Sequence, residues 1–168
     1  MSTDPEVLYL YHGGRLDGPV EVRPQAKKDM QHGPGFYVTD DLDRARRYAK
    51  GGKRTYRVKV KSPRLASEVK VPLAQLEEWV KNTPRLRNRS KLLKDLQASA
   101  QRVGAQTLPA NYLINLALYH EAIGPKTGPQ LAAFMREVGA QATRARVAGE
   151  TWWTIFDPDV VLGYEQLK

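Results

Sequence analysis

The fold of this chain is decided by the stretch Gly33-Pro-Gly-Phe-Tyr-Val-Thr-Asp-Asp-Leu-Asp-Arg-Ala-Arg-Arg-Tyr-Ala-Lys50. Its two glycines around a proline permit the backbone angles of a tight turn. A short strand is predicted over Phe36–Thr39. Asp40 or Asp41 can then accept the free N–H groups of a helix's first turn, and that helix is predicted over Leu42–Lys50. The stretch therefore predicts a turn, a strand and a helix in immediate succession.

Three further strands are predicted on either side of this unit. The first is apolar, covers Glu6–His12 and leads through two glycines into a loop rich in Gly and Pro. The second, Arg54–Lys61, alternates Tyr and Val with Arg and Lys. This period of two predicts a half-buried strand with one apolar and one cationic face. The third, Thr151–Phe156, is aromatic and β-branched, as strands often are.

A helical block separates the second of these strands from the third. Pro72 can begin one helix, and Asn88 or Ser90 can cap a second. Two more helices are predicted over Ala110–Ile123 and Gly128–Val138, the last of them ended by a glycine. Apolar residues recur at helical spacing in the block, so each helix has one face to bury.

Strands, then helices, then a strand predict an α+β fold. The chain of 168 residues suits a single domain that buries about two-thirds of its unfolded surface. We expect that domain to cover residues 1–168, with a helical insertion at about 65–140. The chain has no cysteine, which excludes disulfides and thiolate nucleophiles. No secretory signal or membrane-length apolar run is visible, so we expect a soluble protein of the cytoplasm, or of a host's cytoplasm if it is injected.

The formal charge of +9 is unevenly distributed along the chain. Lys and Arg crowd the segment from Arg44 to Arg64, which contains no acid, and the segment from Lys81 to Arg102, which contains only Asp95. Such surfaces attract phosphates, of a nucleic acid or of a dinucleotide, although charge runs also form ordinary solvated faces. The candidate contacts to a polyanion are Arg57, Lys59, Lys61, Arg85, Arg87 and Arg89.

His12 ends the apolar first strand, immediately before Gly13 and Gly14. The glycine pair allows another molecule to approach the backbone closely, which makes His12 a candidate site residue as well as an ordinary strand-end histidine. The chain has three histidines, and no two have the short helical spacing of a metal pair, so we predict no zinc site. The glycine doublet matches neither the dinucleotide fingerprint nor the phosphate-loop pattern.

Tyr37, Glu150 and one of two adjacent tryptophans are further candidates for a site. Tyr37 alternates away from its apolar neighbours, and a phenol ring beside a glycine turn can stack on a planar ligand. Trp152 and Trp153 point to opposite faces of their strand, so one is expected in the core and the other in a cleft or exposed. Glu150 precedes them as the only acid between Gly139 and Asp157. It is either catalytic or a turn acid.

In order and spacing, these blocks resemble mono-ADP-ribosyltransferase domains of bacteria and phages. The matching blocks are His12 with Gly13, Gly-Phe-Tyr-Val-Thr-Asp around Tyr37, the helix that follows, the basic strand and the terminal Ile-Phe-Asp-Pro. The resemblance covers residues 6–64 and 149–162, about half the chain, and none of 65–140. It implies a split, strongly twisted two-sheet α+β core that binds NAD as a substrate between the sheets.

The same resemblance implies roles for individual residues. His12 would hydrogen-bond the ribose on the nicotinamide side, Gly13 would contact the carboxamide with Gly14 beside it, and Tyr37 would stack on the nicotinamide. A glutamate on a later strand would orient the ribose and stabilise an oxocarbenium-like transition state, because positive charge develops on the sugar as nicotinamide leaves.

The family's glutamate register falls on Trp152 in this chain, which would then line the NAD site. Glu150 lies two residues earlier, on the same face and roughly 7 Å further along a regular strand. Three alternatives follow. Glu150 serves after a local bulge; the domain belongs with members that lack the glutamate; or transferase activity has been lost.

The leading hypothesis is an NAD-dependent mono-ADP-ribosyltransferase of the glycosyltransferase class, a toxin or phage-type modifier of a protein or nucleic acid. The alternative is a catalytically silent binding module of the same fold that recognises nucleic acid or an acidic protein. A third hypothesis, without the resemblance, is a small basic nucleic-acid-binding protein.

Overall fold

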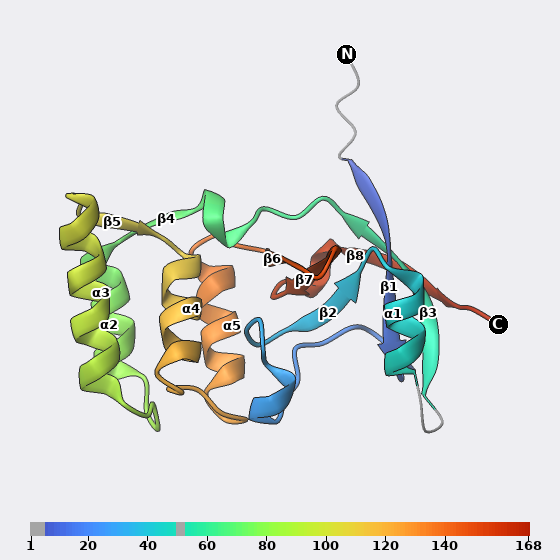
Figure 1. Ribbon diagram of the computed structural model, residues 1–168, viewed down its shortest axis with the longest axis horizontal. Helices are drawn as coiled ribbons and strands as arrows, with labels where there is room; N and C mark the ends of the chain where they lie inside the picture. Colours follow the sequence, from blue (N-terminus) through green and yellow to red (C-terminus); the bar gives the residue numbers. More distant parts are fainter. Residues whose placement is uncertain (1–5, 50–52) are drawn as a thin grey trace, which may run out of the picture.

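The computed structural model describes residues 6–49 and 53–168, and the predicted α+β class is confirmed. Six strands form one antiparallel sheet in the order β6-β7-β2-β1-β3-β8, and β4 pairs with β5 in a separate two-stranded sheet (Figure 1). The strands of the large sheet are β1 Val7–Gly14, β2 Phe36–Thr39, β3 Arg54–Lys61, β6 Ala142–Val147, β7 Glu150–Ile155 and β8 Val161–Gln166.

The large sheet consists of two three-stranded halves that share one residue pair. Pairing of β1 with β3 runs over eight residues, from Val7↔Lys61 to Gly14↔Arg54, and β2 pairs with β7 along its whole length. Between the halves, β1 and β2 share the single pair Tyr11↔Thr39. The strands are thus hydrogen-bonded into one sheet rather than the expected two, and β6-β7-β2 diverges from β1-β3-β8 on either side of that pair.

The stretch that opens the sequence folds as predicted over its described residues. Strand β2 has the predicted bounds, and helix α1 covers Leu42–Tyr48; the predicted end of the helix at Lys50 lies outside the described residues. Asp41 caps the helix by accepting the N–H of Arg44 at 3.0 Å. Asp40 instead accepts the N–H of Thr151 at 3.0 Å, which ties the strand end to β7.

Strand β3 also has its predicted bounds and faces. Tyr56, Val58 and Val60 are buried, whereas Arg57, Lys59 and Lys61 are exposed. The period of two in the sequence predicted this because one face of the strand packs on the core and the other meets water.

The helical segment, residues 65–140, packs beside the sheet as a separate group of helices and short strands. Its elements are a 3-10 turn Ala66–Glu68, β4 Lys70–Pro72, α2 Leu73–Asn82, α3 Arg89–Val103, β5 Thr107–Pro109, α4 Asn111–Tyr119 and α5 Gly128–Glu137. Four helices were predicted here and are found; the two short strands were not predicted. Helix α4 ends before the predicted Ile123 because the chain turns at His120 and Glu121, whose φ is +53°. Further 3-10 turns cover Lys27–Asp29 and Pro158–Val160.

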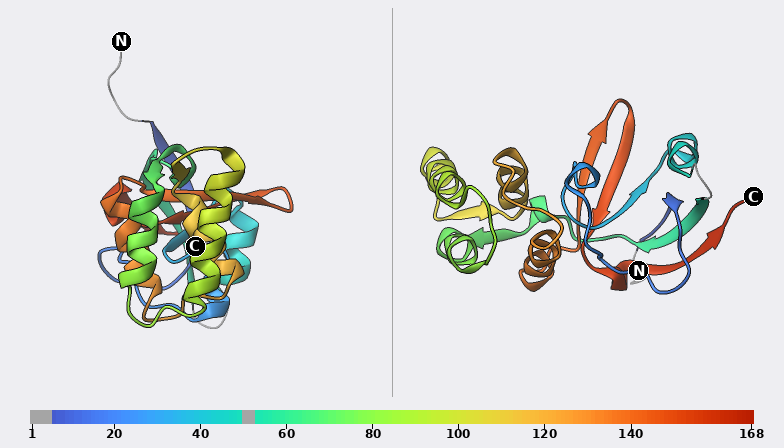
Figure 2. Two further views of the ribbon diagram at one scale, coloured as in Figure 1. Left: turned by 90° about the vertical axis from the view of Figure 1, so that its left-hand side faces the viewer. Right: turned by 90° about the horizontal axis from the view of Figure 1, so that it is seen from below.

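Two hydrophobic clusters correspond to the helical segment and to the large sheet. One fills the helical segment and also takes Met30 and Phe156 from outside it; the other lies on the inner face of the sheet. Helices α4 and α5 stand between the α2–α3 pair and the sheet, and the β6–β7 hairpin projects as an arm (Figure 2). No helix in residues 6–49 and 53–168 has the length and apolar character required to cross a bilayer.

Candidate functional site

A cavity of about 720 Å³ opens where the two halves of the sheet diverge. Its wall includes His12 and Gly13 from β1, Tyr37 from β2, and Glu150 and Trp152 from β7. These residues come from separated parts of the chain and were singled out in the sequence for their chemistry. Volumes of roughly 300–1,000 Å³ are typical of small-molecule sites. Gly14 is the last residue of β1, and a Cβ atom added to Gly14 would lie 2.6 Å from Nε2 of His12.

His12 joins the two halves of the sheet at the cavity. Its Nδ1 lies 2.7 Å from the carbonyl oxygen of Tyr37. Because a carbonyl can only accept, Nδ1–H is the donor, and Nε2 of neutral His12 is an acceptor with no hydrogen-bond partner among the described residues. The ring packs on Phe36, with centroids 4.4 Å apart. Burial lowers the pKa of His12, the bond to the Tyr37 carbonyl partly opposes this, and the positive charge of Lys53 lowers it further.

The Tyr37 hydroxyl is committed to the glycine turn before β2. It donates to the carbonyl of Gly33 at 2.5 Å and accepts the N–H of His32 at 3.0 Å. Burial raises the pKa of Tyr37 to about 12, so the phenol stays protonated at neutral pH. The hydroxyl therefore shapes the turn, and the ring is the part of Tyr37 that remains for a ligand.

Glu150 is the first residue of β7 and is only 7% exposed. Its Oε2 accepts a hydrogen bond from Nε of Arg44 at 2.7 Å, and this contact raises the pKa of the Arg44 guanidinium. The pairing of β6 with β7 continues without a shift from Ala142↔Ile155 to Val147↔Glu150. The bulge considered from the sequence is therefore absent, and Glu150 reaches the cavity wall from a regular strand.

The two tryptophans divide as expected from strand alternation. Trp153 packs against the sheet core, and Trp152 lines the cavity with its indole edge-on to Tyr48, at 5.5 Å between centroids. Helix α1 supplies Tyr48 and Arg44 to the wall because it packs closely on β1. A Cβ at Gly13 would lie 2.2 Å from the carbonyl oxygen of Ala45, so only glycine fits there.

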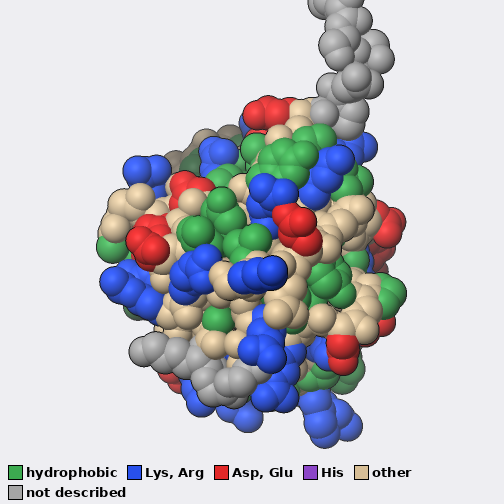
Figure 3. Space-filling view, turned by 90° about the vertical axis from the view of Figure 1, so that its right-hand side faces the viewer, with side chains coloured by type: hydrophobic (Ala, Val, Ile, Leu, Met, Phe, Trp, Pro, Cys, Tyr) green, Lys and Arg blue, Asp and Glu red, His purple; other side chains and the backbone are tan. Residues whose placement is uncertain are grey.

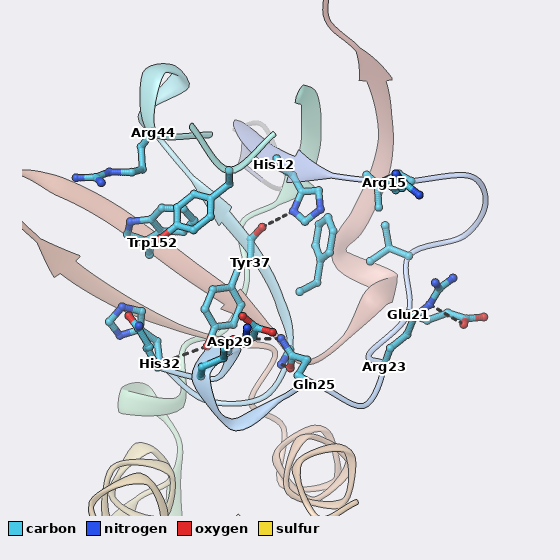
Figure 4. Close-up of a pocket in the computed structure, with 18 of the residues that line it drawn as sticks. His12, Arg15, Glu21, Arg23, Gln25, Asp29, His32, Tyr37, Arg44 and Trp152 are labelled. Atoms are coloured by element: carbon cyan, nitrogen blue, oxygen red, sulfur yellow. Dashed lines mark hydrogen bonds and ion pairs between the residues drawn. The ribbon is translucent and has the colours of Figure 1, made fainter. Parts of the chain in front are cut away.

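Sequence reasoning missed the wall built by the β1–β2 loop. That loop contributes the cations Arg15, Arg23 and Lys28 and equally many acids, Asp17, Glu21 and Asp29, and Arg23 lies 3.8 Å from Glu21. Figure 4 shows Arg15 and Arg23 across the opening from Arg44 and Trp152. Side chains of the sheet hold the loop in place: Tyr56 accepts the N–H of Leu16 at 3.1 Å, and Tyr164 donates to Gly18 O at 2.7 Å. The available signal was the loop's length, because long irregular loops in compact domains are often functional.

The predicted basic contacts do not form one surface. The β3 cations and the Arg85–Arg89 segment, which joins α2 to α3, lie at opposite ends of the long axis (Figure 1). Arg57 forms an ion pair with Glu165. Arg89 donates to the backbone carbonyls of Lys81 and Thr83, at 2.6 and 2.8 Å, and so closes the end of α2. The two segments are therefore two separate basic surfaces, and the predicted contact of either with a polyanion stays a prediction.

The helical segment does not cover the cavity. All wall residues come from the ranges 12–48 and 147–152, so no described residue of 65–140 contributes. Across residues 6–49 and 53–168, no cluster of three or more His, Cys, Asp or Glu side chains is arranged to hold a metal ion. The cavity thus offers an aromatic wall, one buried carboxylate, a histidine acceptor and a rim that carries both cations and acids, which suit an organic ligand with planar and polar parts.

Comparison of the chain with protein-family models, with curated proteins and with solved structures finds no match.

Proposed function

We propose that this protein is an NAD-dependent mono-ADP-ribosyltransferase that transfers ADP-ribose to a macromolecular target and releases nicotinamide. The observation that carries the proposal is the meeting of His12, Tyr37, Glu150 and Trp152 around one cavity of about 720 Å³ at the split in the sheet. The proposal also draws on the resemblance of the sequence blocks that contain these residues to that family of transferases.

In the proposed reaction, the bond between C1′ of the ribose and the nicotinamide nitrogen breaks, and its electron pair leaves with nicotinamide. The sugar carbon becomes oxocarbenium-like, a nucleophile of the target attacks it, and the nucleophile's proton passes to solvent. Nε2 of neutral His12 would accept a ribose hydroxyl, and the ring of Tyr37 would stack on nicotinamide. The Glu150 carboxylate would stabilise the positive charge as it develops.

The direct test is nicotinamide release from NAD by the full chain, with a panel of proteins and nucleic acids as targets. His12→Ala should sharply reduce NAD binding, measured by calorimetry, while the thermal melt shows an intact fold. Tyr37→Phe keeps the ring and should retain NAD binding, whereas Tyr37→Leu should lose it. Equal NAD affinity of the wild type and both His12→Ala and Tyr37→Leu would contradict the proposal.

A second candidate function is a catalytically silent binding module, and the observation that favours it is the ion pair of Glu150 with Arg44 at 2.7 Å. In a silent module this pair would be purely structural. NAD cleavage separates the two functions: a wild-type chain that binds its macromolecular partner but releases no nicotinamide with any target supports the silent module.

A further inference from the structure

The half-sheet β1-β3-β8 has an outer face that carries tyrosines and cations. Residues opposite one another in the β1–β3 ladder point to the same side, and Tyr9 pairs with Lys59 as Tyr11 pairs with Arg57. Alternate residues, such as Leu10 and Val58, are buried on the other side. We call the outer set the tyrosine–lysine face; it consists of Tyr9, Tyr11, Arg57, Lys59 and Lys61.

The tyrosine–lysine face is open along its β8 edge. Gly163 pairs with Lys59, so β8 places no side chain beside that lysine. Tyr9 is 55% exposed, and the Arg57 guanidinium stands 5.5 Å from the centroid of its ring. A cation over an aromatic face is attracted to the ring, so Arg57 holds Tyr9 in a defined orientation as a platform.

The charge on this side of the molecule is predominantly positive. Figure 3 shows the side that carries α1, β1 and β3, where Lys and Arg side chains are interspersed with hydrophobic ones. The acid that adjoins the face on β8, Glu165, is neutralised by Arg57. Within the described part of the chain, neither Lys59 nor Lys61 forms an ion pair, so both remain available to an anion.

We propose that the tyrosine–lysine face binds single-stranded nucleic acid, with bases stacked on Tyr9 and Tyr11 and phosphates held by Lys59 and Lys61. The two tyrosines are i and i+2 on one strand, roughly 7 Å apart, and aromatic side chains beside cations are the combination by which proteins bind single strands. Its polar groups are cations and phenols, which recognise phosphates and bases, the features that DNA and RNA strands share.

Two other occupants fit the face less well. In a duplex the bases are stacked on one another, so their flat faces are closed to the tyrosines. An acidic peptide would pair with Lys59 and Lys61 but would leave the tyrosine rings without a function. The face is also separate from the cavity, whose wall contains none of its five residues, so binding there needs no NAD and does not rest on the proposed transferase activity.

The test is fluorescence anisotropy of the full chain with a labelled single strand of about 15 nucleotides, as oligothymidylate and as oligouridylate, and with a duplex of mixed sequence. Both single strands should bind more tightly than the duplex, and affinity should fall as salt rises. Polyglutamate serves as an unlabelled competitor. Duplex binding equal to or tighter than that of both single strands would overturn the proposal.

Variants assign the binding to this face. Tyr9→Ala should weaken single-strand binding roughly 5- to 150-fold, the range for losing one stacked base. Its matched control is Tyr119→Ala, since Tyr119 is 78% exposed on distant α4 and its loss should change nothing. Lys59→Gln with Lys61→Gln should reduce the salt slope by about 0.7 per lysine, whereas Lys91→Gln should not. Unchanged single-strand binding in Tyr9→Ala would refute the proposal. If polyglutamate displaces the labelled strand equally well from the wild type and from Tyr9→Ala, the face would be assigned to an acidic protein.

Discussion

Replacing Glu150 by Gln is the sharpest test of the proposed chemistry, because the change removes the carboxylate charge, and with it the ion pair to Arg44, while it keeps the size and shape of the side chain. The carboxylate is 7% exposed at the start of β7 and accepts the Nε–H of Arg44 at 2.7 Å. A glutamine of the same shape still offers an oxygen to that donor. We therefore expect Glu150→Gln to keep the fold and the position of the side chain.

The expected loss of turnover follows from this burial. A negative charge in a site shielded from water stabilises developing positive charge far more strongly than one in bulk solvent. Removing one aligned electrostatic stabiliser lowers turnover by roughly 100- to 1000-fold. NAD affinity should be retained, because the charge that Glu150 would stabilise develops only on the way to the transition state.

The assay is nicotinamide release at saturating NAD, accompanied by calorimetric NAD binding and a thermal melt of each variant. Glu137→Gln is the matched control, because Glu137 is an exposed acid at the end of α5 and its change should leave turnover intact. A Glu150→Gln variant that folds normally and retains wild-type turnover would refute the catalytic role. The domain would then belong with the glutamate-independent alternative.

Three further predictions concern the framework of the site. Burial lowers the pKa of His12 below 6.5, so the unfolded chain binds a proton at this histidine more tightly than the folded chain does. The contribution of neutral His12 to the free energy of unfolding is therefore complete above pH 6.5 and is lost as the pH falls through the lowered pKa. His12→Gln should flatten the dependence of Tm on pH between these two values. Tyr37→Phe, which deletes both hydroxyl contacts to the glycine turn, should reduce the urea-derived unfolding free energy by about 1–2 kcal/mol, and an unchanged value would show that water replaces them. Gly13→Ala should lower stability by about 1–3 kcal/mol or more in a thermal melt, because its Cβ meets the Ala45 carbonyl at 2.2 Å, whereas Gly18→Ala meets no atom within 4 Å and should cost far less.

The sequence by itself determined those elements whose local pattern is strong. Strand β2, strand β3 with its two faces, and the four helices of the insertion follow from turn glycines, capping residues and apolar periodicity. The missed strands β6 and β8 are the two edges of the large sheet. Their sequences contain alanines and arginines in Ala142–Val147 and a glycine in Val161–Gln166. Such segments become strands because β7 and β3 supply hydrogen-bond partners, and that depends on tertiary structure rather than on intrinsic preference.

The candidate site divides in the same way. His12, Tyr37 and Glu150 could each be singled out in the sequence, because a histidine, a phenol and an isolated acid beside glycine turns carry recognisable chemistry. Only the tertiary structure decided that they share a cavity, that the β1–β2 loop adds a wall with both cations and acids, and that Arg44 is the partner of Glu150 from 106 residues away. Sequence patterns report on neighbours within a helical turn or a strand, whereas this cavity is made where two halves of a sheet, joined by the single pair Tyr11↔Thr39, diverge.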